Sequence, residues 1–177
     1  AAAGPRYPAD PIVYHRGWAE ARVFDNRRTY YGHEIPLGPD FGGPLFFAHY
    51  SFLGLDPRRL SDRYADYWQQ NVSHSLVNYE HCVRNPNGFA GYGPACWGLT
   101  ANESDLGYRE ISPTSDIGVI APTAAIGSIP YTPRQSLAAL RYFRNERGAE
   151  LFGEYGFLSS FCDARGWVSP TYIAIDQ

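Results

Sequence analysis

A chain of 177 residues fits one domain and is long enough to bury a substantial core. Hydrophobic residues make up 44% of it and charged residues 19%, which is typical of a globular protein and excludes disorder as the main state. The net charge is -3, and the 15 basic residues, all arginine, form no stripe along the sequence. Nucleic acid is therefore not an expected partner.

The sequence also indicates whether the chain is processed and whether it spans a membrane. The sequence holds no methionine, which predicts that it was cut from a longer precursor, with any signal peptide removed or further upstream. The longest apolar stretch, 117–130, is interrupted by Pro122. It is also shorter than the roughly 18–20 residues that a membrane-spanning helix needs. No membrane span is expected.

The spacing of the cysteines and histidines does not indicate a metal site. Cys82, Cys96 and Cys162 form no C-x-x-C pair, which argues against both a disulfide scaffold and a zinc ribbon. The three are predicted to be small buried side chains, with one disulfide as the alternative. The five histidines show no pair at metal-ligand spacing, and no glycine-rich phosphate loop is present. No metal or cofactor is expected.

The first third of the chain is predicted to be mostly helical. Residues 18–30 are compatible with a helix, whereas the glycines and prolines of 31–41 indicate a loop or a short hairpin. Residues 43–53 are apolar nearly all round, which suits a buried helix. A longer helix is predicted from Asp56 to about His81, because apolar residues recur there every four positions, namely Leu60, Tyr64, Trp68 and Val72.

The second half combines a long loop with two shorter helices. Residues 85–113 are rich in turn formers and aromatics together, which is typical of an ordered functional loop. A short buried helix is predicted after Pro122. Another is predicted from Thr132, where a capping residue precedes proline, to Gly148. Its apolar face would hold Leu137, Leu140 and Phe143. No repeat or interdomain linker divides the chain.

Aromatic residues and carboxylates are the best candidates for a functional site. Aromatics make up 16% of the chain, and flat rings beside arginines and carboxylates suit a carbohydrate site, although a tyrosine-rich core is the simpler alternative. Glu154 stands between aromatics and two glycines, where packing would favour the protonated carboxyl that a general acid needs. It could equally pair with an arginine or cap a helix. Asp116 could be a helix cap, and Asp176 lies near the end of the chain.

Several motifs occur together in a fixed order. They are GGPLFFAHYS at 42–51, GYG at 91–93, CWGLTA at 96–101, IAPTAA at 120–125, IPYTP at 129–133, GEYGF at 153–157 and IDQ at 175–177. In this order they resemble the putative glucoamylase family of bacterial glycoside hydrolases, which includes endo-β-1,2-glucanases. The resemblance runs from about Tyr30 to the last residue.

The resemblance implies an all-α fold, an (α/α)₆ barrel with a cleft at one end. Such a barrel needs roughly twice this length, so residues 1–177 would form the C-terminal portion of a single catalytic domain, without the N-terminal half and the closing helix. The missing half is then the expected protein partner. The resemblance also implies a periplasmic or secreted enzyme that acts on glucose polymers.

The same resemblance assigns residues to the cleft. Glu154, Asp116 and Asp176 would line it as catalytic carboxylates, together with the loop that holds Trp97. The family often has aspartate where this chain has Ser159, which removes one carboxylate, and a further family acid would lie in the N-terminal half. Sugar hydroxyls and faces would contact a second group of residues, namely Trp97, Tyr92, Tyr155, His49 and Arg84.

The function expected from these residues is hydrolysis of a glucan. One carboxylic acid would protonate the leaving glycosidic oxygen, while the other would activate water or attack the anomeric carbon. The linkage stays open, with β-1,2-glucan and α-1,4-glucan both compatible. One alternative is a carbohydrate-binding protein without catalysis on the same scaffold. Another is a purely structural helical partner of a second subunit, with a large exposed apolar face.

Overall fold

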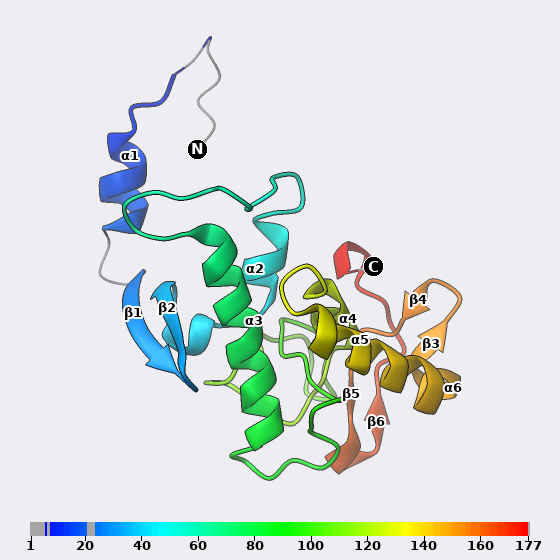
Figure 1. Ribbon diagram of the computed structural model, residues 1–177. Helices are drawn as coiled ribbons and strands as arrows, with labels where there is room; N and C mark the ends of the chain where they lie inside the picture. Colours follow the sequence, from blue (N-terminus) through cyan, green and yellow to red (C-terminus); the bar gives the residue numbers. More distant parts are fainter. Residues whose placement is uncertain (1–5, 7, 21–23, 177) are drawn as a thin grey trace.

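The computed structural model describes residues 6, 8–20 and 24–176 (Figure 1). Its first half contains α1 (Ile12–Tyr14), the π-helical turn η1 (His15–Ala19), β1 (Asp25–Tyr30), β2 (His33–Leu37), the 3₁₀ turn η2 (Asp40–Gly42), α2 (Phe46–Tyr50) and α3 (Tyr67–Arg84). Its second half contains α4 (Pro122–Gly127), α5 (Pro133–Arg141), the π-helical turn η3 (Tyr142–Glu146), α6 (Gly148–Leu151), β3 (Phe152–Gly153), β4 (Gly156–Phe157), β5 (Phe161–Cys162), the 3₁₀ turn η4 (Asp163–Arg165), β6 (Trp167–Val168) and the 3₁₀ turn η5 (Ala174–Asp176).

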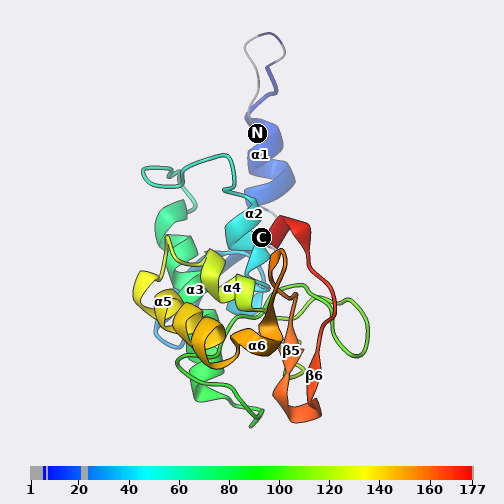
Figure 2. The same ribbon diagram turned by 90° about the vertical axis from the view of Figure 1, so that its right-hand side faces the viewer.

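Helix α3 stands between two groups of elements. Figure 1 shows α1 and the hairpin β1–β2 on one side of α3, and α4, α5, α6 and the strands β3 to β6 on the other. Figure 2 shows the C-terminal turn η5 beside α2, although these elements are far apart in the sequence. No helix of the described ranges is long and apolar enough to cross a membrane.

Antiparallel strand pairs correct the expectation of an all-α chain. β1 pairs with β2, β3 with β4, and β5 with β6. The predicted helix 18–30 is wrong over its second part, where β1 lies, and residues 21–23 fall outside the described residues. The hairpin forms because Gly32 adopts a positive φ at the turn and the register buries the side chain of Ile35 opposite Arg28.

The central helix α3 begins later than predicted. Residues 56–65 form turns instead of the expected first helical turns, because the side chain of Asp62 accepts hydrogen bonds from the backbone N–H groups of Tyr64 and Ala65. The helix starts where Asp66 caps it and accepts a hydrogen bond from the backbone N–H of Gln69 at 2.9 Å.

Loss of the Asp66 cap should destabilise α3 measurably. We expect Asp66→Ala to lower the free energy of unfolding by about 1 kcal/mol, because the N–H of Gln69 loses its acceptor. Asp66→Ser should retain most of the stability, since serine also caps helices. Urea unfolding followed by circular dichroism measures both changes. Equal losses for the two variants would contradict this role of the side chain.

The irregular segment between α3 and α4 builds much of the core. Trp97, Leu99 and Ile111 are completely buried, which confirms an ordered 85–113 segment and places Trp97 inside the protein, whereas Tyr108 is exposed. Asn78 of α3 fixes this segment, since its amide exchanges two hydrogen bonds with the backbone of Leu99, at 3.1 and 3.0 Å. The three cysteines are free and buried, as predicted.

The helices α4 and α5 cover the same core. Both begin as predicted, with proline in the first turn after Ala121 and after Thr132. The buried face of α5 differs from the predicted one: Ser136 and Ala139 are buried with Phe143 of η3, whereas Leu137 is exposed. The helical path changes to a π-helical turn after Arg141 and does not continue to Gly148 as one α-helix.

Candidate active site

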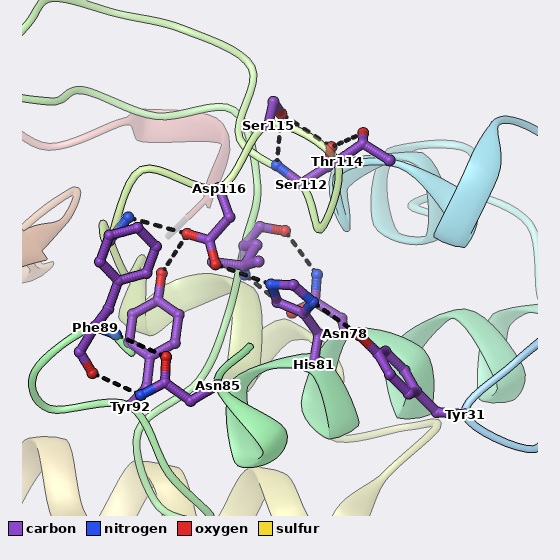
Figure 3. Close-up of polar contacts among 12 residues, drawn as sticks. Tyr31, Asn78, His81, Asn85, Phe89, Tyr92, Ser112, Thr114, Ser115 and Asp116 are labelled. Atoms are coloured by element: carbon purple, nitrogen blue, oxygen red, sulfur yellow. Dashed lines mark hydrogen bonds and ion pairs between the residues drawn. The ribbon is translucent and has the colours of Figure 1, made fainter. Parts of the chain in front are cut away.

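The carboxylate of Asp116 lies inside the protein, where three donors surround it (Figure 3). Its side chain is 1% exposed. Oδ1 accepts a hydrogen bond from the hydroxyl of Tyr92 at 2.7 Å and another from the backbone N–H of Gly118 at 3.0 Å. Oδ2 lies 2.9 Å from Nε2 of His81. Both oxygens are therefore engaged, and Asp116 does not face an open surface in this chain.

His81 connects this carboxylate to the hairpin at the other side of α3. Its Nδ1 lies 3.2 Å from the hydroxyl of Tyr31 at the β1–β2 turn. Because the carboxylate of Asp116 only accepts, Nε2 carries the proton that it donates to this carboxylate. Figure 3 shows the resulting row from Tyr31 through His81 and Asp116 to Tyr92.

The loop after α3 brings Tyr92 to this row. Asn85 ends α3 in a left-handed conformation, and its amide exchanges hydrogen bonds of 2.7 and 2.8 Å with the backbone of Phe89. The ring of Phe89 fills the space beside Gly118, where a Cβ atom would lie 2.7 Å from it. Burial raises the pKa of Tyr92, so its hydroxyl stays protonated and donates to Asp116. This arrangement fixes the loop.

A second carboxylate, Asp176, lies at the C-terminal end beside α2. Its Oδ1 accepts a short hydrogen bond from the hydroxyl of Tyr50. Its Oδ2 is buried and has no partner among the described residues. Burial raises the pKa of Asp176, although the hydrogen bond from Tyr50 acts in the opposite direction. A carboxyl group with these properties has a stabilised protonated form and one oxygen free for a further contact.

His49 is the neighbour of Tyr50 on α2 and is packed against α4. Its Nε2 lies 3.0 Å from Oγ of Ser128, and that hydroxyl donates to the backbone oxygen of Ala124 at 3.0 Å. Gly127 leaves room for the ring, since a Cβ atom there would approach it to 3.1 Å. Burial lowers the pKa of His49 to about 4. The predicted sugar contact is thus a neutral imidazole fixed by Ser128.

Buried neutral histidines predict an acid-sensitive fold. The pKa values of His49 and His74 are lowered to about 4, in both cases mainly by burial. Between pH 6.5 and 4 the unfolded state binds protons that the folded state does not, so stability is complete above pH 6.5 and falls as the pH decreases. For each histidine, we expect the free energy of unfolding to change with pH by a slope that approaches about 1.4 kcal/mol per pH unit.

The matched test of this pH dependence uses the buried His74, whose Nε2 lies 2.9 Å from the backbone oxygen of Gly43. His74→Gln keeps a donor but does not titrate, so it should reduce the slope of the unfolding free energy between pH 6.5 and 4. Urea unfolding at a series of pH values measures the slope. An unchanged slope in the variant would exclude His74 as a source of the acid sensitivity.

Glu154 and Tyr155 form the turn between β3 and β4. Both are exposed, and Glu154 makes no hydrogen bond or ion pair with another described side chain. The expected packing of Glu154 among aromatic rings is therefore wrong, because the two-residue turn directs it outward. The ring of Tyr155 meets that of Tyr172 edge to face at 5.5 Å, which places this turn next to the segment that leads to Asp176.

Two predicted sugar contacts lie elsewhere. Trp97 is completely buried and packs edge to face against Tyr79 at 5.5 Å, so it is a core residue in this chain and not the predicted sugar contact. Arg84 ends α3, forms an ion pair with Glu80 at 3.3 Å and lies over the ring of Tyr31 at 5.0 Å. Within the described ranges, no three histidine, cysteine or acidic side chains are placed to hold a metal ion.

The structure thus separates the predicted residues into two groups. Asp116 and Tyr92 meet in the buried row, while Asp176 and His49 lie at the end formed by α2 and η5, to which the β3–β4 turn is adjacent. Sequence reasoning missed Tyr50, although it stands next to His49 in the motif at 42–51. It also missed His81 as the partner of the buried carboxylate.

A sequence model of the putative glucoamylase family matches residues 1–177, and the chain belongs to this family. A putative glucoamylase from Bacteroides uniformis is 55% identical, with a TM-score of 0.95 over 98% of this chain and 43% of that protein. An endo-β-1,2-glucanase from Chitinophaga pinensis, solved with sophorotriose and glucose, is 44% identical, with a TM-score of 0.92 and the same coverage.

A curated relative is more distant. The exo β-1,2-glucooligosaccharide sophorohydrolase of Parabacteroides distasonis is 39% identical over an alignment of 193 residues. The alignment covers 98% of this chain and 27% of that protein. The chain therefore spans about a quarter of this relative and less than half of the two solved proteins.

Proposed function

We propose that this chain is part of a glycoside hydrolase that cleaves glucose polymers, with β-1,2-glucan as the substrate. The observation that carries the proposal is the environment of Asp176, a carboxyl group with a raised pKa and one unengaged oxygen. Named relatives that cleave β-1,2-linked glucans support the choice of substrate. The (α/α)₆ barrel, with the remaining helices supplied by the rest of the polypeptide, is part of the same proposal.

In this mechanism a carboxylic acid protonates the leaving oxygen and a carboxylate assists water or attacks the anomeric carbon. Asp176 suits the first role because its raised pKa favours the protonated form. Glu154 is the proposed second carboxylate, since it is exposed and unpaired beside Tyr155. Tyr155, 66% exposed, offers a ring for the face of a sugar.

Asp116 takes a positioning role in this proposal. Its oxygens hold Tyr92 and His81, and its side chain is closed to a substrate in the chain as described. The other member of a catalytic pair could also come from the rest of the barrel, in which case one of Glu154 and Asp176 would act with it. Variants of each carboxylate separate these cases.

The test is a chimera in which this chain replaces the matching segment of the Chitinophaga pinensis endo-β-1,2-glucanase, to which it is 44% identical. The proposal predicts that the folded chimera releases reducing ends from β-1,2-glucan. Glu154→Gln should lower kcat by about 100- to 10,000-fold, as for loss of a catalytic acid or base. Unchanged turnover would remove Glu154 from the catalytic machinery. Binding of glucan by the folded parent chimera without any reducing-end release would favour a carbohydrate-binding protein.

A further inference from the structure

Helix α4 lies against both elements that form the hydrogen bond between Tyr50 and Asp176. Asp176 belongs to η5, which contacts α4 directly. Tyr50 belongs to α2, which is joined to the end of α4 by a side-chain hydrogen bond. Figure 2 shows α2, α4 and η5 side by side, although they come from separate parts of the sequence. The hydrogen bond at the candidate acid therefore depends on how α2 and η5 are fixed to α4.

Helix α2 is held at its start through backbone groups. It has five residues, which is too short for a helix to be stable by itself, so other elements must fix it. The backbone N–H of Leu45 donates to the oxygen of Leu99 at 3.0 Å, and that of Phe46 donates to the hydroxyl of Thr100 at 3.1 Å. These bonds anchor the first residues, whereas Tyr50 is the last residue of the helix.

The end of α2 is held by Ser128 through the side chain of His49. The hydroxyl of Ser128 donates its proton to the oxygen of Ala124, so it accepts from Nε2 of His49, 3.0 Å away. Ser128 is itself firmly placed, because it is completely buried and its backbone oxygen accepts from the N–H groups of Tyr131 and Thr132, at 2.9 and 2.8 Å. The imidazole thus links a fixed point on α4 to the last turn of α2.

The rotation of α2 about its axis decides where the hydroxyl of Tyr50 lies. Tyr50 follows His49 directly, about 100° further around the helix. Side chains reach about 5 Å or more from a helix axis, so a rotation of about 10° moves the end of one by roughly 1 Å. The hydroxyl of Tyr131 also holds this end, through a longer bond of 3.3 Å to the backbone oxygen of Ala48. The side chain of His49 provides the shorter restraint.

We propose that His49 and Ser128 are positioning residues, which hold the hydroxyl of Tyr50 on the carboxyl group of Asp176. The inference rests on the proposed function, because it concerns the carboxyl group proposed as the general acid. It also gives His49 a role different from the predicted contact with sugar.

The titratable groups around this pair support the direction of its hydrogen bond. Burial and the bond to Asp176 raise the pKa of Tyr50, and Tyr108 acts in the same direction, so the hydroxyl of Tyr50 remains the donor. Burial, with a smaller contribution from His74, lowers the pKa of His49 to about 4. His49 therefore acts near neutral pH through its hydrogen bond and its packing, without a charge.

Ser128→Ala removes the acceptor of His49 and tests the proposal in the folded chimera. We expect kcat on β-1,2-glucan to fall by about 10- to 100-fold, as for misplacing a reacting group by about 1 Å, with KM little changed. The alkaline limb of the pH–rate profile should move to higher pH, because the bond from Tyr50 lowers the pKa of Asp176. An alkaline limb that stays in place would overturn the proposal.

A double variant shows whether Ser128 acts through Tyr50. The chimera with Ser128→Ala and Tyr50→Phe together should have the same kcat as Tyr50→Phe alone, because both changes remove one hydrogen bond. Losses that multiply would mean that Ser128 acts by another route, and would contradict the positioning role.

Two further variants separate positioning from general stability. His49→Gln keeps an N–H donor for Ser128, so its alkaline limb should lie close to that of the parent, whereas His49→Leu should behave like Ser128→Ala. The matched control is Ser136→Ala, which removes another completely buried serine, whose hydroxyl lies 3.1 Å from that of Thr132. It should leave the limb in place. Equal shifts for both serines would overturn the proposal.

A measurement without catalysis separates this inference from the proposed function. The pKa of Asp176 can be followed by NMR through its ¹³C-labelled carboxyl group, with Asp176→Asn to assign the signal. Ser128→Ala should raise this pKa, as Tyr50→Phe does. A raised pKa in an inactive chimera would refute the hydrolase and keep the positioning role. An unchanged pKa in an active chimera would refute the positioning role alone.

Discussion

Asn in place of Asp176 should lower kcat of the chimera on β-1,2-glucan by about 100- to 10,000-fold, the range for loss of a general acid. The amide keeps an acceptor for the hydroxyl of Tyr50 but cannot deliver a proton. KM should change little. The matched control is Asp25→Asn, which alters an exposed ion pair with Arg27 and should leave kcat unchanged.

Removal of the Tyr50 hydroxyl should shift the pH dependence of kcat. Its hydrogen bond lowers the pKa of Asp176 against the larger effect of burial, so Tyr50→Phe should raise that pKa further. If Asp176 donates the proton, the alkaline limb of the pH–rate profile moves to higher pH in Tyr50→Phe. An alkaline limb that stays in place, with Asp176→Asn active, would exclude Asp176 as the acid.

Asp116→Ala should be the most destabilising change at the buried row, by about 3–5 kcal/mol, because it leaves three donors without an acceptor. Asp116→Asn should lose less, since one amide oxygen still accepts. Tyr92→Phe, which removes one donor, should lose about 1 kcal/mol.

Urea unfolding of the chain or of the chimera measures these losses. Asp25→Ala serves as the control, because an exposed carboxylate of this kind should change stability by less than about 0.5 kcal/mol. A loss below about 1 kcal/mol for Asp116→Ala would mean that the row does not hold the loop, and Asp116 would then be open to a direct role in the site.

Local signals in the sequence predicted local structure well. The helices after Pro122 and Thr132 begin where proline and the preceding residue indicate, because these signals act within one helical turn. The helix expected from Asp56 begins only at Tyr67, because the side chain of Asp62 binds nearby backbone N–H groups instead. The strand β1 was missed, since its pairing with β2 rather than its own pattern stabilises it.

The candidate site is formed by contacts between residues that are far apart in the sequence, and the spacing of motifs does not reveal such contacts. Tyr50 and Asp176 are 126 positions apart, and His81 and Asp116 are 35 apart, yet each pair is joined by a hydrogen bond. The resemblance implied a place in the cleft for Trp97, but its side chain is completely buried in the core, which the aromatic content of the sequence had left open as the simpler alternative. The family resemblance was confirmed because it relied on the order of several motifs rather than on single residues.

We propose that this chain forms part of an enzyme that hydrolyses β-1,2-glucan. The most direct measurement compares reducing-end release by the folded chimera from β-1,2-glucan and from starch, with Asp176→Asn as the inactive reference. We expect the chimera to release reducing ends from β-1,2-glucan, the reference to release none, and starch to give little release with either protein. A folded chimera that releases reducing ends from neither polymer, or only from starch, would contradict it.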